Sequence, residues 1–180
     1  YEAITCLTED EKQQLLALTP KLREIFTRYT LYYHTPSAHL EGAGSIMTGH
    51  YFDEAVYGPL YFGYGGRGDP GDRRDVLRDV EQRYMRHVPE AVLILVEASP
   101  EVIAQRMRES PHQHGVLPEK DIERVLQMFE EEFESSLIGN KLSVDTSTAT
   151  VEETLAEFLR EVEPYLTESD RLRMLTRAMS

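Results

Sequence analysis

The run from Ala91 to Ala98, AVLILVEA, constrains the fold of this chain more than any other segment. Its continuous apolar residues are typical of a strand buried on both faces of a parallel sheet. Ser99-Pro100-Glu101 follows directly and predicts the start of a helix, because serine caps helices and proline is favoured at their first position. A strand that leads straight into a helix indicates an α/β fold.

Two more segments predict strands, and helical patterns separate them. Gly42 to Gly49 holds Ile46 and Met47 between glycines, and KLSVDT spans Lys141 to Thr146. Helices are predicted at 8–18, 20–29, 53–61, 72–87, 99–108, 121–137, 151–166 and 168–179. Residues 30–36 fit either a helix end or a strand. We therefore expect a single α/β domain over residues 1–180, a three-layer fold around a parallel sheet, in which residues 109–138 form a lid loop and helix.

Charge and hydropathy exclude several classes of protein. The net charge of −13, from 32 acidic and 19 basic residues, argues against a partner that presents a phosphate backbone, so nucleic acid is not expected. The longest apolar run, Ala91 to Val96, is far shorter than a membrane span, and Tyr1 opens no secretory leader. Cys6 is the single cysteine, so no internal disulfide is expected and a cytoplasmic location is predicted.

Ligands of parallel sheets bind beyond the carboxyl ends of the strands, so the segments that follow the strands carry the candidate sites. After the first predicted strand, Asp53 and Glu54 could act as a general base or hold a metal-bound phosphate. Aromatic neighbours could bind a planar substrate. These neighbours are His50, Tyr51, Tyr57 and Tyr61. The alternative is a helix N-terminus that favours carboxylates, with the aromatic rings packed as core.

Arginines and hydroxyl residues follow the other two strands. Arg106 and Arg108 lie about two helical turns after AVLILVEA and could neutralise polyphosphate charge, or pair with surface glutamates. Asp145 to Thr150 follows the last strand. His112 and His114 have no partner cluster, so no metal site is expected there. The glycines of GYGGRG are not followed by the Lys-Ser or Lys-Thr pair of a phosphate-binding loop.

In their order, three motifs resemble the later two-thirds of a P-loop nucleoside or nucleotide kinase of the thymidylate-kinase-like type. AVLILVEASPEVIAQRMR is similar to that family's second apolar strand and arginine-bearing helix. DIERVLQMFEEEF resembles the helix after the lid, and KLSVDTSTATVEETLAEFL the last strand and helix. The family's Asp-Arg after the preceding strand is replaced by Gly49-His50. Its ATP-binding Walker A segment would precede Tyr1, so we expect an incomplete P-loop NTPase-like domain, truncated at its N-terminus.

The resemblance implies a transferase that moves the γ-phosphoryl group of ATP, with Mg²⁺, to a small nucleoside, nucleotide or other hydroxyl or phosphate acceptor. It implies catalytic roles for Asp53, Glu54, Arg106 and Arg108. Acceptor binding would fall to the aromatic group named above. Nucleotide binding would fall to four residues, Arg106, Thr146, Ser147 and Thr148.

Two other classes stay open from the sequence. One is a non-catalytic α/β protein-interaction module, and the weaker one is a metal-dependent hydrolase. The terminal helix, Glu168 to Met179, could dock on its own domain or on a second copy in a homodimer.

Overall fold

A computed structural model describes residues 7–37, 46–111 and 115–178. The chain divides into two compact units, Tyr1–Pro89 and Glu90–Ser180, and each is described by itself. Cys6, the first part of the predicted strand at 42–45, and the pair His112 and His114 lie outside the described residues. None of the helices described is long and apolar enough to cross a membrane.

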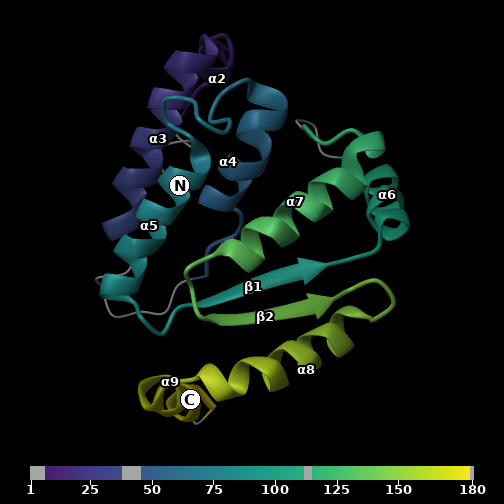
Figure 1. Cartoon of the computed structure of the whole chain (residues 1–180). Helices are drawn as coiled ribbons and strands as arrows, with labels where there is room; N and C mark the ends of the chain where they lie inside the picture. Colours follow the sequence, from purple (N-terminus) through teal and green to yellow (C-terminus); the bar gives the residue numbers. More distant parts are fainter. Residues whose placement is uncertain (1–6, 38–45, 112–114, 179–180) are drawn as a thin grey trace. The chain divides into compact units, whose positions relative to one another are not determined.

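The first unit is helical (Figure 1). Its elements are α2 (Glu9–Leu16), α3 (Pro20–Ser37), α4 (Tyr51–Tyr57), the π-helix η1 (Gly58–Phe62) and α5 (Arg73–His87). The predicted start at Thr8 is confirmed, since Thr8 and Glu11 form a reciprocal capping box. Residues 30–36 continue α3. Gly58-Pro59 does not end the helical path, because Pro59 lies in the first turn of the π-helix, where its missing N–H is tolerated.

The second unit holds two parallel strands and their helices (Figure 1). In order they are β1 (Val92–Glu97), α6 (Pro100–Glu109), η2 (Glu119–Asp121), α7 (Ile122–Ser135), β2 (Asn140–Asp145), α8 (Val151–Val162), η3 (Glu163–Tyr165) and α9 (Glu168–Ala178). The strands pair in register from Val92 opposite Asn140 to Glu97 opposite Asp145. Helix α7 packs along β1 and α8 along β2.

The prediction of a three-layer parallel sheet is wrong. Within the described residues the sheet has two strands, and most of the chain is helical. Ile46, Met47 and Thr48 form no strand, and Ile46 is 89% exposed. Two apolar residues between glycines bury too little surface to stabilise a strand. The expectation that AVLILVEA is buried on both faces is also wrong, because Val96 is 66% exposed.

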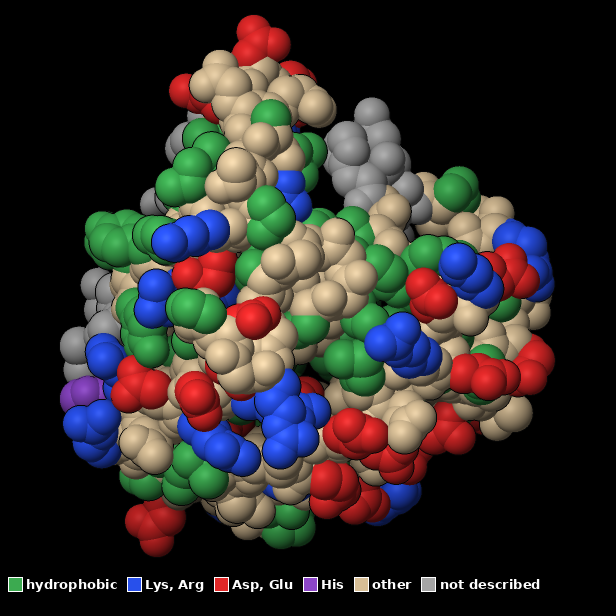
Figure 2. Space-filling model, turned by 45° about the horizontal axis from the view of Figure 1, so that its top comes forward, with side chains coloured by type: hydrophobic (Ala, Val, Ile, Leu, Met, Phe, Trp, Pro, Cys, Tyr) green, Lys and Arg blue, Asp and Glu red, His purple; other side chains and the backbone are tan. Residues whose placement is uncertain are grey.

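Charged and apolar side chains share the surface. Figure 2 shows acidic and basic side chains with hydrophobic ones between them on the face drawn. Several large apolar side chains are half or more exposed, in stripes along helices α3, α8 and α9. Exposed apolar patches of this kind indicate contact with another surface.

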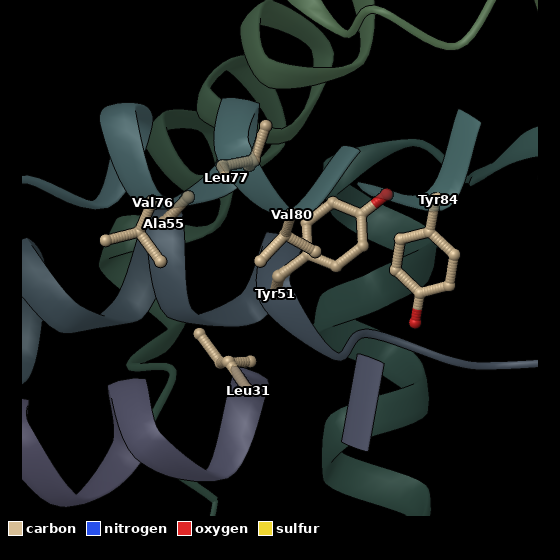
Figure 3. Close-up of a cluster of buried hydrophobic side chains, with 7 residues drawn as sticks. All are labelled: Leu31, Tyr51, Ala55, Val76, Leu77, Val80 and Tyr84. Atoms are coloured by element: carbon tan, nitrogen blue, oxygen red, sulfur yellow. The ribbon is translucent and has the colours of Figure 1, made fainter. Parts of the chain in front are cut away.

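The core of the first unit forms where α3, α4 and α5 meet (Figure 3). Val80 of α5 is fully buried at its centre. The cluster consists of Leu31, Tyr51, Ala55, Val76, Leu77, Val80 and Tyr84. On α5 these apolar residues recur every three or four positions, which is the spacing that places them on one helix face.

We predict that Val80→Ala lowers the free energy of unfolding of the first unit by about 2 kcal/mol, because it leaves a cavity in a packed core. Leu16→Ala, at a side chain that is 54% exposed, should change it by less than about 0.5 kcal/mol. Urea unfolding followed by tyrosine fluorescence measures this unit selectively, because nine of the ten tyrosines precede Pro89 and the chain has no tryptophan. Equal effects of the two substitutions would contradict the described core.

Candidate functional site

The carboxyl ends of β1 and β2 lie side by side, and each leads into a helix. Ser99 caps α6 by accepting a hydrogen bond from the Val102 amide, and Thr150 caps α8 in a capping box with Glu153. The N-termini of α6 and α8 therefore come directly after the same edge of the strand pair. Such an edge of a parallel pair is where anionic ligands bind in α/β proteins.

Arg106 is held at this edge by the loop after β2. Its Nη1 donates to the Thr146 hydroxyl at 2.9 Å, and its Nη2 donates to the Thr146 carbonyl at 2.7 Å. The Thr146 hydroxyl in turn donates to the Glu97 carbonyl at 2.9 Å. Among the described residues, the Arg106 guanidinium group bonds to Thr146 with two of its five N–H donors. The remaining donors can bind a ligand. Arg106 and Thr146, which were each predicted to bind a nucleotide, are thus in direct contact, and that role stays a prediction.

Ser147 joins the two loops. The Ser99 amide donates to the Ser147 hydroxyl at 2.9 Å, and that hydroxyl donates to Asp145 Oδ1 at 2.5 Å. The Ser147 amide also donates to Asp145 Oδ1, at 2.8 Å. These two bonds, the hydroxyl first, lower the pKa of Asp145 and keep it ionised. The sequence prediction included Asp145 in the candidate segment after the last strand but gave it no role in binding or catalysis.

The other two residues predicted here lie apart from this network. Arg108 forms an ion pair with Glu119 at 2.7 Å, and both side chains are more than half exposed. An exposed pair of this kind adds little stability. Thr148 lies in the bend after β2 and is exposed. The alternative role for Arg108, pairing with a surface glutamate, is therefore the one that the structure describes.

In the first unit, a tight turn precedes α4. Gly49 and His50 both have positive φ, 68° and 51°. A Cβ at Gly49 would lie 1.9 Å from Asp53 Oδ2, so only glycine fits there. His50 is buried, and its conformation (ψ −120°) is one that non-glycine residues rarely adopt. Strained backbone of this kind gathers at functional sites and marks this turn as a candidate.

Asp53 and Glu54 are neighbours with different environments. Burial, then the charge of Glu54, raises the pKa of Asp53. Glu54 instead binds Arg73 and accepts a hydrogen bond from the Tyr64 hydroxyl at 3.0 Å. A carboxylate whose pKa is raised toward neutrality is the better general base. Of the two predicted carboxylates, Asp53 fits a chemical role, whereas Glu54 is part of an internal ion cluster.

That cluster is centred on Arg73, which is 1% exposed. Its Nη1 donates to Glu24 Oε1 at 2.7 Å, and its Nε donates to Glu54 Oε2 at 3.2 Å. Its Nη2 donates to the Thr27 hydroxyl at 2.5 Å, and the guanidinium lies 4.9 Å from the Tyr64 ring centroid. The sequence carried no signal for this cluster, because its members lie up to 49 positions apart.

The predicted aromatic residues fall into two groups, one buried in the core and one partly exposed. Tyr51 is buried in the core beside Tyr84, with ring centroids 5.9 Å apart, so its role is packing. Tyr57 and Tyr61 stack on each other at 6.0 Å and are partly exposed. Burial, then Asp53, raises the pKa of Tyr57 to about 12, so the phenol stays protonated and can donate a hydrogen bond.

Among the described residues, no three His, Cys, Asp or Glu side chains are grouped as a metal site. Comparison with protein-family models, with curated proteins and with solved structures finds no match to this chain.

We predict that Arg73→Met lowers the free energy of unfolding of the first unit by about 3 to 5 kcal/mol, since it leaves Glu54 without its cation and Glu24 with only the partly exposed Arg28 as its partner. The matched control is Arg83→Met, whose pair with Asp79 is about two-fifths exposed and should contribute less than about 1 kcal/mol. Tyrosine-detected urea unfolding gives both values. A loss of under about 1 kcal/mol for Arg73→Met would show that the cluster is hydrated.

The raised pKa of Asp53 predicts a pH dependence of stability. The folded state binds this proton more tightly than the unfolded state, so the stability contribution of Asp53 is greatest below its ordinary pKa of 3.8 and falls as pH rises through the folded-state pKa. Asp53→Asn should therefore raise the urea midpoint at pH 7, and the gain should vanish below about pH 3.8.

The control for this experiment is Asp75→Asn, which changes an exposed aspartate at the same third position of helix α5. It removes a favourable charge near a helix N-terminus and should not raise the midpoint. A gain from Asp53→Asn that persists at low pH would contradict the assigned cause.

Proposed function

We propose that the chain acts in ATP-dependent phosphoryl transfer to a small hydroxyl- or phosphate-bearing acceptor, such as a nucleoside or nucleotide. The observation that carries the proposal is Arg106, anchored on Thr146 at the carboxyl ends of two parallel strands. A positioned guanidinium beside two helix N-termini is suited to the oxygens of a polyphosphate. The resemblance in motif order supports the same assignment.

The residues of the second unit would bind the nucleotide. Arg106 would stabilise the charge of the phosphoryl group, and the Ser147 and Thr148 hydroxyls lie in the loop that would orient the nucleotide. Bound ATP would supply the phosphoryl group, and Mg²⁺ would neutralise its charge. Mg²⁺ in such sites needs only one or two carboxylates besides the phosphates, and Asp145 is an ionised carboxylate of this edge.

The first unit, taken by itself, carries candidate acceptor-binding residues around α4. Asp53 is suited to the role of a general base there, because burial raises its pKa. His50 and the stacked pair Tyr57 and Tyr61 would contact the acceptor. A cytoplasmic location belongs to the same proposal, since Cys6 is the only cysteine and no internal disulfide can form.

One observation favours a second candidate, a protein-interaction module. Helix α3 presents an apolar stripe of which each member is at least 39% exposed. Its members are Leu22, Ile25, Phe26, Tyr29 and Tyr33. A stripe at helical spacing is suited to a helical or grooved protein partner. A binding module would show no affinity for Mg-ATP.

The test is calorimetric titration with Mg-ATP of the protein together with any residues that its coding sequence places before Tyr1, with hydrogen exchange to locate the bound nucleotide. We expect protection of residues 146–150 and about a tenfold or greater loss of affinity in Arg106→Ala. Arg160→Ala is the control, because that arginine is 69% exposed on α8 and pairs with Glu161. If millimolar Mg-ATP gives neither heat nor protection, the phosphotransferase proposal is wrong and the interaction module replaces it.

A further inference from the structure

We propose that Thr146 is a positioning residue, which holds the Arg106 guanidinium group in place for a phosphate group and does not itself bind the nucleotide. The identity of the ligand rests on the proposed function, whereas the positioning of Arg106 can be measured without a ligand. The expectation from the sequence was different, since it gave both residues a direct role in nucleotide binding. The observation that leads to the proposal is the direction of the hydrogen bonds at the Thr146 hydroxyl.

The proton of the Thr146 hydroxyl is already used inside the protein. This hydroxyl has one proton to donate, and it lies 2.9 Å from the Glu97 carbonyl and 2.9 Å from Arg106 Nη1. Both directions are fixed by chemistry, because a carbonyl can only accept and a guanidinium group can only donate. An ionised phosphate oxygen also only accepts. Thr146 could therefore donate to a phosphate only by breaking its bond to the end of β1.

Thr146 is a firm support because hydrogen bonds hold it to both strand ends. Its amide donates to the Glu97 carbonyl at 2.8 Å, and its hydroxyl donates to the same oxygen, so two bonds connect it to the end of β1. The next residue, Ser147, bonds to the carboxylate of Asp145 and to the Ser99 amide. A side chain that is bound to Thr146 is therefore fixed relative to the edge of the strand pair.

The bonds to Thr146 leave one edge of the Arg106 guanidinium group for a ligand. Nη1 donates to the Thr146 hydroxyl and Nη2 to the Thr146 carbonyl, so each terminal nitrogen uses one N–H. The Nε–H and the second N–H of each terminal nitrogen remain. Nε and the terminal nitrogen beside it form the planar fork that binds two oxygens of one phosphate group. Because Thr146 holds the far end of the group, this fork has a fixed orientation.

Fixing the fork in advance lowers the cost of binding. A mobile arginine loses rotational freedom when it closes on a ligand, whereas an anchored arginine has already lost it. Arg106 is exposed, so the rest of the protein restrains it little without Thr146. Arg108 on the same helix has no such anchor at the strand ends, and its Nη1 donates to Glu119 instead. The Thr146 hydroxyl should therefore raise the affinity for a phosphate group through Arg106 alone.

The first experiment measures the mobility of Arg106 by NMR relaxation of its Nε–H group, without a ligand. Arg106 should be more ordered than Arg124, an exposed arginine on α7, and this comparison needs no variant. Thr146→Val removes the hydroxyl and keeps the shape, so it should make Arg106 more mobile, while Thr146→Ser should keep it ordered. The matched control is Thr176→Val on α9, which also removes a hydroxyl that donates to a backbone carbonyl. It should leave the mobility of Arg106 unchanged.

The second experiment uses Mg-ATP as the probe in the calorimetric titration described above. Thr146→Val should weaken binding by about three- to tenfold, and Thr146→Ser by less than about twofold. In an Arg106→Ala background, Thr146→Val should have no further effect, because Thr146 acts only through that arginine. A direct contact between Thr146 and the nucleotide would instead give the same loss of affinity in both backgrounds.

Three results would overturn the proposal. They are a wild-type Arg106 that is no more ordered than Arg124, a Thr146→Ser variant that behaves like Thr146→Val, and a loss of Mg-ATP affinity that persists in the Arg106→Ala background. The last would make Thr146 a nucleotide ligand. If the wild-type protein does not bind Mg-ATP, the proposed function and the phosphate ligand are wrong, and the relaxation measurement alone decides whether Thr146 positions Arg106.

Discussion

The parallel pairing of β1 and β2 is the constraint on which the second unit depends. Parallel strands cannot be joined by a hairpin, so the chain must cross over between them, and it does so through α6 and α7. The crossover brings both strand ends to one edge. That edge then receives the N-termini of α6 and α8, the Thr146 loop and the guanidinium of Arg106. The site is thus a consequence of strand direction.

The first unit depends on a different interaction. Arg73 at the start of α5 is bound by Glu24 of α3 and Glu54 of α4, so one buried cation connects three helices. A buried ion cluster adds little net stability over an apolar core, but it is costly to break. The effect of this cluster is to hold α4 in a fixed position against α3 and α5. The strained turn at His50 and the carboxylate of Asp53 lie at the start of that helix.

The uncovered surfaces and the phosphotransferase proposal concern different parts of the molecule. The nucleotide site would be built from polar loops at the strand ends, whereas the exposed leucines lie along helix faces. Burial of apolar area drives association, while precise placement of polar groups supports chemistry.

Local signals in the sequence determined much of the secondary structure. Thr8, Ser99 and Thr150 cap the helices that follow them, and AVLILVEA forms β1, because capping and continuous hydrophobicity act over a few residues. The number of strands in the sheet was predicted wrongly, because strand pairing depends on residues far apart in the chain. Contacts between distant residues also separate the environments of Asp53 and Glu54, which are adjacent in the sequence. The packing of the helices brings Arg73 to Glu54, whereas Asp53 lies beside the turn at Gly49.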